Sequence, residues 1–286
     1  MRAGTMKLLR LLTLVLLGSF GAARAQAPAA CSVPDPNFHL YLLMGQSNMA
    51  GRGPITPELA AAGHARVFMQ NAAGEWVPAK NPVHYDKPKV AGVGPGLSFG
   101  VAMAEANPAV RIGLVPCAVG GTAIRYWQPG AYDEATKTHP YDDAVLRIQN
   151  AMRCGVVRGV LWHQGEADSN PTAAAAYLPK LAELIGRVRA LVGQPALPVV
   201  AGELGRFKPN SLTFNEQLLA LPTLVPHTAV VTSENLTDMG DQTHLDGASA
   251  SEYGRRYAVK MQALQAAAPA PGKGRKPRKI KTKSRL

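Results

Sequence analysis

Five short apolar segments, spaced along the middle of the chain, place the strongest constraint on its fold. They cover residues 38–44, 111–116, 157–162, 197–202 and 228–232. None alternates between apolar and polar residues, which is typical of strands that helices cover on both faces. Helical patterns follow them, at 96–106, 141–152, 172–192, 215–220 and 248–267. Alternating strands and helices predict an α/β fold with a parallel sheet between two layers of helices.

The amino-terminal segment does not belong to this pattern. Residues 1–25 have the layout of a secretory signal, with basic residues before an apolar stretch at 11–22 and a small-x-small cleavage site at 23–25. The apolar stretch is too short to span a bilayer. We therefore expect an exported protein, secreted or periplasmic, in which residues 26–37 form a linker.

The carboxyl-terminal segment, residues 266–286, begins rich in Ala and Pro and ends strongly basic. From Lys273 onward it holds eight Lys or Arg and no acid, so we expect a disordered tail. Of the 31 Lys plus Arg in the chain, eight lie here and four in the signal segment, so the remaining 19 balance the 19 acids. The high net charge therefore gives no indication of a nucleic-acid-binding fold, although the tail could contact anionic envelope polymers. Residues 38–265 are long enough for one large α/β domain.

Three cysteines follow the signal segment, and an odd number leaves at least one thiol free. Cys31 and Cys154 each precede a predicted strand and belong at the amino-terminal edge of the sheet, whereas Cys117 follows a strand. If an exported protein of this kind forms a disulfide, Cys31–Cys154 is the pair that chain direction favours. Three unpaired cysteines are the open alternative.

A serine stands directly after the first predicted strand, in the sequence Gly45-Gln46-Ser47-Asn48. Open α/β sheets bind their ligands at the carboxyl ends of their strands. A hydroxyl at that place can attack a substrate if another residue supplies a base. The alternative is that Ser47 only caps the following helix.

Three further segments place glycine or polar residues where a strand ends or a helix begins. They are residues 119–122, 163–166 and 241–246. Because the carboxyl ends of parallel strands share one edge of the sheet, these segments and Ser47 can meet there.

The four segments together resemble SGNH-type serine esterases, in the branch that holds carbohydrate esterase family 6 and the sialate O-acetylesterase domain. The likeness is carried by GQSNMAGRG at 45–53, VGGT at 119–122, WHQGE at 162–166 and DQTH at 241–244, followed by EYGRRYA at 252–258. It spans residues 38–258. The serine motif is not the G-x-S-x-G of α/β-hydrolases, because Met49 occupies the place of the second glycine.

The resemblance implies the SGNH hydrolase fold, a three-layer α/β/α sandwich around a parallel, five-stranded, flavodoxin-like sheet. The second strand of that order could lie in residues 65–70. Residues 51–95, rich in Gly, Pro, Ala and Asn, then form a long excursion beside the site.

Acyl transfer requires a nucleophile, a base, a group that orients the base, and donors that face the oxyanion. We expect Ser47 to be the nucleophile and His244 the base, since Asp241 precedes it in the D-x-x-H pattern of the family. A capping or solvent-facing role is the alternative for His244. The orienting acid stays open between Asp241 and Glu166, with Asp246 a third carboxylate nearby.

The expected oxyanion donors are the backbone N–H of Ser47, the glycine turn at Gly121 and the side-chain amide of Gln164. A simple tight turn is the alternative for Gly121. Asn48 either orients the nucleophile loop or binds substrate. Trp127 and His163 are candidate substrate contacts, with Arg125, Tyr126 and Trp162 as possible further walls of a cleft; buried aromatic residues are often only core.

The resemblance implies removal of O-acetyl groups from a carbohydrate, either xylan or sialic acid. The alternatives are an esterase for short-chain lipids or thioesters on the same fold, and a non-catalytic carbohydrate-binding protein. The sequence has no His, Cys and Asp cluster with metal-ligand spacing, no P-loop and no dinucleotide fingerprint. We expect no cofactor, no metal and no nucleic-acid partner.

Overall fold

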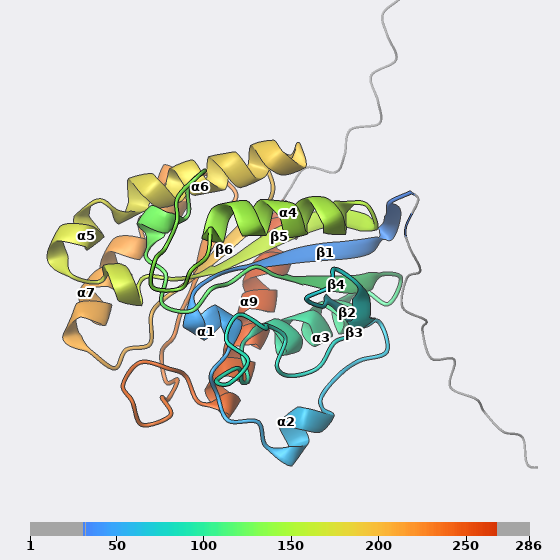
Figure 1. Ribbon diagram of the computed structural model, residues 1–286, viewed down its shortest axis with the longest axis horizontal. Coiled ribbons are helices and arrows are strands. Elements are labelled where there is room, and N and C mark those ends of the chain that lie inside the picture. Colours follow the sequence, from blue (N-terminus) through green and yellow to red (C-terminus); the bar gives the residue numbers. More distant parts are fainter. Residues whose placement is uncertain (1–30, 32, 268–286) are drawn as a thin grey trace, which may run out of the picture.

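The computed structural model describes residues 31 and 33–267 (Figure 1). The expected signal segment at 1–25 and the basic tail from residue 268 onward lie outside the described residues.

A central sheet of seven strands, in the order β3-β2-β4-β1-β5-β6-β7, organises the described part of the chain. The strands are β1 (Asp35–Gly45), β2 (Val67–Gln70), β3 (Trp76–Pro78), β4 (Arg111–Pro116), β5 (Gly155–His163), β6 (Val199–Gly202) and β7 (Thr228–Val231). All five predicted strands are present, and residues 65–70 contribute β2.

The sheet differs from the expected five-stranded, parallel, flavodoxin-like sheet in three respects. It has seven strands. It is mixed, because β3 pairs with β2 in the antiparallel sense. In addition β4, and not β2, lies beside β1. The sequence did not predict β3, since a strand of three residues is too short to produce a recognisable pattern. The turn before it is formed by Asn71, whose side chain accepts the N–H groups of Ala73 and Glu75.

Helices cover both faces of the sheet, with α4 and α6 on one side and α3 and α9 on the other (Figure 1). The α-helices are α1 (Ser47–Ala50), α2 (Pro57–Ala61), α3 (Gly96–Ala106), α4 (Pro140–Met152), α5 (Pro171–Ala175), α6 (Tyr177–Val192), α7 (Pro209–Leu218), α8 (Leu221–Leu224) and α9 (Gly247–Ala267). Two 3₁₀ turns, η1 (Ile124–Tyr126) and η2 (Glu166–Asp168), follow β4 and β5. Among the described helices, none has the length and apolar character needed to cross a bilayer.

The two hydrophobic cores explain why the strand sequences lack polar alternation. In β1, Leu40, Leu42 and Met44 pack into the core under α4 and α6, whereas Tyr41 and Leu43 pack into the core under α3 and α9. Successive side chains of a strand point to opposite faces, so a strand with helices on both faces is apolar throughout.

A disulfide joins Cys31 to Cys154 across 123 residues, with their Cα atoms 5.0 Å apart. Asp35 N–H also donates to the Cys154 carbonyl at 3.0 Å, so the first residues of β1 are held beside the start of β5. The bridge therefore lies at the amino-terminal edge of the sheet, where chain direction placed both cysteines. Cys117 is a buried free thiol, and its burial raises its pKa to about 12.

Candidate active site

Ser47 is positioned by a sharp turn between β1 and α1. Gly45 has a positive φ of 128°, and a Cβ at this place would collide with the carbonyl oxygen of His163. The N–H of Gln46 donates to that same carbonyl at 2.9 Å. The end of β1 is thus fixed against the end of β5, and Ser47 lies at the carboxyl edge of the sheet.

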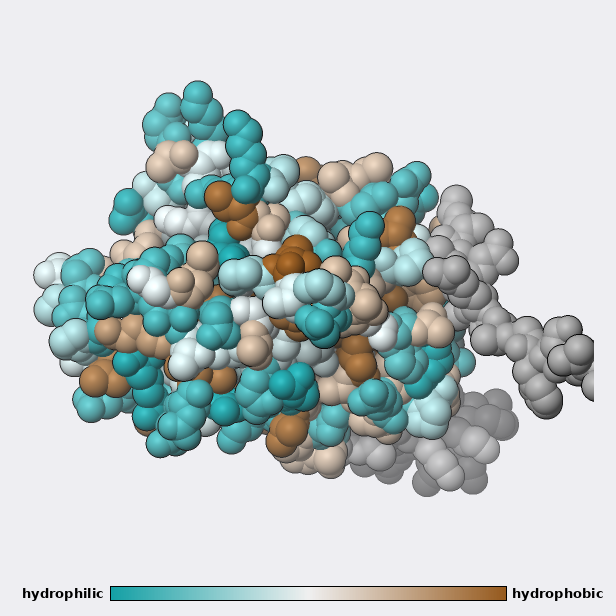
Figure 2. All heavy atoms as spheres, turned by 90° about the horizontal axis from the view of Figure 1, so that it is seen from below, coloured by the Kyte–Doolittle hydropathy of each residue, from teal (hydrophilic) through white to brown (hydrophobic). Residues whose placement is uncertain are grey.

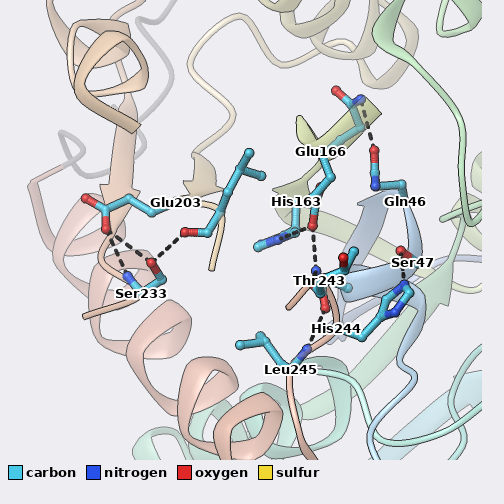
Figure 3. Close-up of polar contacts among 12 residues, drawn as sticks. Gln46, Ser47, His163, Glu166, Glu203, Ser233, Thr243, His244 and Leu245 are labelled. Carbon is cyan, nitrogen blue, oxygen red and sulfur yellow. Dashed lines mark hydrogen bonds and ion pairs between the residues drawn. The ribbon is translucent and has the colours of Figure 1, made fainter. Parts of the chain in front are cut away.

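The structure brings Ser47 and His244 together although they are 197 residues apart (Figure 3). Asp241 contacts the other side of the His244 ring. The Ser47 Oγ lies 3.0 Å from His244 Nε2. The other ring nitrogen, Nδ1, lies 2.6 Å from Asp241 Oδ2. A carboxylate can only accept, so Nδ1 carries the proton and Nε2 is free to accept the Ser47 proton. The Ser47 hydroxyl does not cap α1.

The Asp241 carboxylate is fixed by its own backbone. Its Oδ1 accepts the N–H groups of Thr243 at 2.9 Å and of His244 at 2.8 Å. Burial raises the pKa of Asp241, but the hydrogen bonds from His244 and Thr243 outweigh it and lower the pKa to about 2. Asp241 is therefore ionised at neutral pH.

Glu166, the other candidate for the orienting acid, contacts a different partner. In Figure 3 the His244 ring points toward Ser47, whereas the Glu166 carboxylate lies beside His163. Its Oε1 accepts the Nδ2–H of Asn48 at 2.5 Å and lies 3.4 Å from His163 Nε2. Of the two acids left open by the sequence, Asp241 is the one that contacts His244.

Asp246, the third carboxylate, belongs to the start of α9. It accepts the N–H of Ser249 at 2.7 Å and the hydroxyl proton of Thr237 at 2.5 Å. These are the contacts of a helix cap.

Two backbone N–H groups are available as oxyanion donors. Among the described residues, no acceptor is paired with the N–H of Ser47 or of Gly121. Gly121 has a φ of 89° and its turn is exposed toward the cleft. The turn is fixed by Asp86, which accepts the Gly120 N–H at 2.8 Å and pairs with Arg52 at 2.7 Å. Asp86 was not predicted from the sequence, because it follows no strand and belongs to no recognised motif.

The expected third donor, Gln164, is buried and its amide is already occupied. Its Nε2 donates to the Thr122 carbonyl at 3.1 Å, to Asp168 at 2.6 Å and to Gln46 Oε1 at 3.1 Å. Two N–H groups serve these three acceptors, so none remains for an oxyanion.

Gln46 presents a free amide nitrogen instead. Since its Oε1 accepts from Gln164, its Nε2 is turned away from that contact. No acceptor among the described residues is paired with this nitrogen, and Gln46 lines the same cleft as Ser47. Gln46 is a functional candidate that the sequence analysis missed, although it adjoins the nucleophile.

The Ser47 hydroxyl opens into a cleft with a volume of about 670 Å³. The cleft is lined by Gln46, Ser47, Arg52, Lys87, Val90, Gly120, Gly121, Ala167, Met239, Thr243 and His244. Within residues 31 and 33–267, no group of three or more His, Cys, Asp or Glu side chains is arranged to hold a metal ion.

Neither expected substrate contact reaches this cleft. Trp127 is 1% exposed and packs edge-on against Trp162, with its indole N–H donated to Thr122. His163 is fully buried under α9, where its ring packs against Tyr253. Both side chains belong to the core, since a side chain without accessible surface cannot contact a ligand.

Asn48 is also placed away from the substrate. It is 3% exposed, and its amide binds Glu166 and the backbone on either side of His244. Of the two roles considered for Asn48, this geometry favours orientation of the loops.

Comparison with known proteins agrees with the resemblance that the four motifs indicated. Residues 37–263 match the family model described as "Carbohydrate esterase, sialic acid-specific acetylesterase". The chain belongs to this family of carbohydrate acetylesterases. Membership implies an esterase with a carbohydrate substrate.

Individual relatives support this assignment. The chain is 36% identical over 189 residues to the "Probable carbohydrate esterase At4g34215" of Arabidopsis thaliana, a match that covers 58% of this chain and 69% of that protein. The X-ray structure of the Arabidopsis protein superposes with a TM-score of 0.71 at 30% identity, over 82% of this chain and 99% of that one.

More distant structures share the fold. XAC1771, a carbohydrate acetylesterase from Xanthomonas citri, has a TM-score of 0.62 at 21% identity, over 80% of this chain and 57% of that one. NanS has a TM-score of 0.63 at 17% identity, over 82% of this chain and 100% of that one.

Proposed function

We propose that this protein is an exported serine esterase that removes O-acetyl groups from a carbohydrate through a covalent acetyl-enzyme. The observation that carries the proposal is the 3.0 Å contact between Ser47 Oγ and His244 Nε2 at the cleft, with Asp241 on the other ring nitrogen. A nucleophile, a base and an orienting acid in this order are the parts that acyl transfer requires.

In the first half of the proposed reaction, His244 Nε2 takes the Ser47 proton as Oγ attacks the acetyl carbonyl carbon. The N–H groups of Ser47 and Gly121 and the amide of Gln46 face the developing oxyanion. Collapse breaks the bond to the sugar oxygen, which receives the proton from His244. In the second half, His244 deprotonates a water, which attacks the carbonyl carbon of acetyl-Ser47. Collapse breaks the bond between this carbon and Ser47 Oγ, acetate leaves, and His244 returns the proton to Oγ.

Export rests on the signal layout of residues 1–25 and on the Cys31–Cys154 disulfide, which is the kind of bond that persists outside the cytosol. The basic tail is proposed to contact anionic envelope polymers through its charge.

Between the two substrates under consideration, the cleft favours the acidic one, an O-acetylated sialic acid. Of the residues that line it, Arg52 and Lys87 are basic and none is acidic. Arg52 is paired with Asp86, but no described residue forms an ion pair with Lys87. The Lys87 ammonium lies 3.7 Å from where a Cβ of Gly121 would be, close to the proposed oxyanion site. A sugar carboxylate would pair with this ammonium, whereas the xylose units of a xylan backbone have no acid for it.

A lipid or thioester esterase would need an apolar acyl channel, whereas the apolar side chains of the cleft, Val90, Ala167 and Met239, share it with the basic Arg52 and Lys87. On the face shown in Figure 2, hydrophobic side chains are scattered and not gathered into one large patch. Activity on p-nitrophenyl octanoate equal to that on the acetate would favour this alternative. Sugar binding without covalent labelling of Ser47 by a fluorophosphonate would favour a non-catalytic protein.

The proposed function is tested by acetate release from O-acetyl sialic acid, acetylated xylan and p-nitrophenyl acetate. Wild type should release acetate and Ser47→Ala should not, with a loss of about 10⁶-fold in kcat. Lys87→Gln should raise KM for the acidic sugar roughly two- to fivefold and leave p-nitrophenyl acetate unaffected. Lys89→Gln is the matched control, since Lys89 does not line the cleft. Equal effects of Lys87→Gln and Lys89→Gln on KM, or a preference of wild type for xylan, would refute the proposal that the substrate is an acidic sugar.

A further inference from the structure

Apart from the Ser47–His244 contact itself, the side-chain amide of Asn48 attaches the loop that carries His244 to the nucleophile helix α1. Its Oδ1 accepts the N–H of Leu245 at 3.0 Å, and its Nδ2 donates to the Thr243 carbonyl at 2.9 Å. Thr243 and Leu245 are the two neighbours of His244 in sequence. Asn48 is itself the neighbour of Ser47. Ser47 and His244 are therefore connected through hydrogen bonds between their sequence neighbours.

The other side of the amide is held by Glu166, which accepts the second Nδ2 proton at 2.5 Å. An amide can rotate by 180° and exchange its oxygen and nitrogen. In the exchanged orientation, the Asn48 oxygen would face both the Glu166 carboxylate and the Thr243 carbonyl, and its nitrogen would face the Leu245 N–H. Together with the Thr243 carbonyl and the Leu245 N–H, Glu166 therefore favours the orientation in which the bonds beside His244 form.

The Glu166 carboxyl is ionised, and its position suits it to accept the Nδ2 proton of Asn48. Burial raises its pKa, but contacts with His163 and Asn48 lower it, and the pKa ends below its ordinary value. The carboxylate side chain is only 14% exposed, and it comes from η2 at the end of β5, a strand of the central sheet. A rigid, charged acceptor on the scaffold thus faces the amide.

The His244 loop has few other attachments. Residues 239–242 are exposed, and Gln242 takes a positive φ of 55°. Outside the Asn48 contacts, the buried Leu245 and a bond from Lys208 Nζ to Thr243 Oγ1 at 2.8 Å tie the loop to the rest of the molecule. Within the loop, the Met239 N–H donates to the His244 carbonyl at 2.9 Å and the Asp246 N–H donates to the Thr237 carbonyl at 3.2 Å. Segments with few buried contacts open easily, so the loss of two backbone attachments would displace His244.

We propose that Glu166 is a positioning residue: acting through Asn48, it sets the His244 ring at bonding distance from Ser47 and does not itself take part in the reaction. This inference rests on the proposed Ser47–His244 chemistry and assigns the acid of the WHQGE segment a role that is distinct from that of Asp241.

The test compares two substitutions of similar size. Glu166→Gln keeps an oxygen that can accept from Asn48 and should retain kcat within about tenfold of wild type. Glu166→Met has no such acceptor and should lose about 10²-fold in kcat, because a displacement of about 1 Å between reacting groups costs this much. KM for p-nitrophenyl acetate should stay unchanged in both. Glu183→Met, at an exposed position of α6, is the control for the substitution itself.

A charge swap tests the connection through Asn48. Asn48→Asp places two carboxylates in contact and should lose at least as much kcat as Glu166→Met. The double variant Asn48→Asp/Glu166→Gln restores one donor and one acceptor and should regain part of the loss, a coupling that independent sites would not show.

The rate of fluorophosphonate labelling of Ser47 is measured in parallel, since it reports the Ser47–His244 contact without a sugar substrate. Failure of wild type to label would refute the proposed function itself. Labelling of wild type and Glu166→Met at equal rates, or additive effects of the Asn48 and Glu166 substitutions, would refute the positioning role alone. A 10⁴-fold loss in folded Glu166→Gln would also overturn it, because that loss belongs to an acid that contacts His244.

Discussion

Residues 241–246 contain two aspartates that are close in sequence and differ in role. Asp241 contacts the His244 ring, because it accepts two N–H groups of its own turn and the turn brings the ring back over it. Asp246, two residues beyond His244, caps α9. The direction of each side chain, and not its spacing from His244, separates the two roles.

Asp241→Asn should lower kcat by on the order of 10⁴-fold, because an amide beside Nδ1 permits the wrong tautomer of His244. Asp246→Asn is the matched control and should keep kcat within severalfold and stability nearly unchanged, since Asn caps a helix about as well as Asp. Kinetics with p-nitrophenyl acetate and thermal unfolding measure the two effects. Equal losses of kcat in both variants would contradict the assignment.

The side chain before the nucleophile should act as the third oxyanion donor. Gln46→Leu removes its free amide nitrogen and should lower kcat by about 10²–10³-fold with little change in KM. Gln217→Leu, at an exposed position of α7, controls for the substitution. A Gln46→Leu enzyme with kcat within threefold of wild type would show that two backbone donors suffice.

At the scale of elements, the two edges of the sheet have separate tasks. The carboxyl edge carries the turns after β1, β4 and β5, and the loop after β7, which together form the site (Figure 1). The amino edge carries the Cys31–Cys154 disulfide. Stability and activity can therefore be changed separately.

Replacement of Cys31 and Cys154 by serine should lower the free energy of unfolding by about 2–5 kcal/mol, since the bridge closes a long loop. For a domain of this size, this corresponds to a fall in Tm of roughly 10 °C. Reductant should bring wild type down to the Tm of the double variant and leave the variant unchanged. Well below Tm, kcat should be unaffected; a loss of kcat there would show that the bridge also shapes the site.

At the scale of the whole molecule, two histidines are kept neutral by the fold. Burial lowers the pKa of His84, beside Asp86, Arg147 and Arg52, to about 4, and burial with the nearby Arg158 does the same for His39. An unfolded chain would protonate both near pH 6.5. Between these values the unfolded state binds more protons than the folded state, so stability rises with pH in this window.

We therefore expect the free energy of unfolding to be highest above about pH 6.5 and to fall as the pH is lowered toward 4. Each histidine contributes at most about 1.4 kcal/mol per pH unit. Thermal unfolding at pH 7.5, 6.5, 5.5 and 4.5 measures how the free energy of unfolding changes with pH. His39→Gln should make this dependence shallower. An unchanged slope in this variant would show that His39 does not contribute.

The sequence predicted much of the fold because strand and helix patterns are local. Residues 38–44 form the centre of β1, and residues 111–116 form β4. It predicted Ser47 as a candidate because parallel strands bring their carboxyl ends to one edge, and His244 and Asp241 because they match the D-x-x-H pattern of the family that the motifs resemble. The antiparallel β3 was missed, since three residues form a strand only when a neighbouring strand is already in place.

What the sequence determined by itself is the α/β class of the fold and a set of candidate residues for the proposed acyl transfer. Only the tertiary structure decided which of them touch. Asp241 and not Glu166 reaches His244, Gln46 and not Gln164 has a free amide, and Trp127 and His163 lie in the core. The physical reason is that hydrogen bonds act over about 3 Å and have few donors and acceptors to share. Such pairings depend on the packing of distant segments, which no local pattern records.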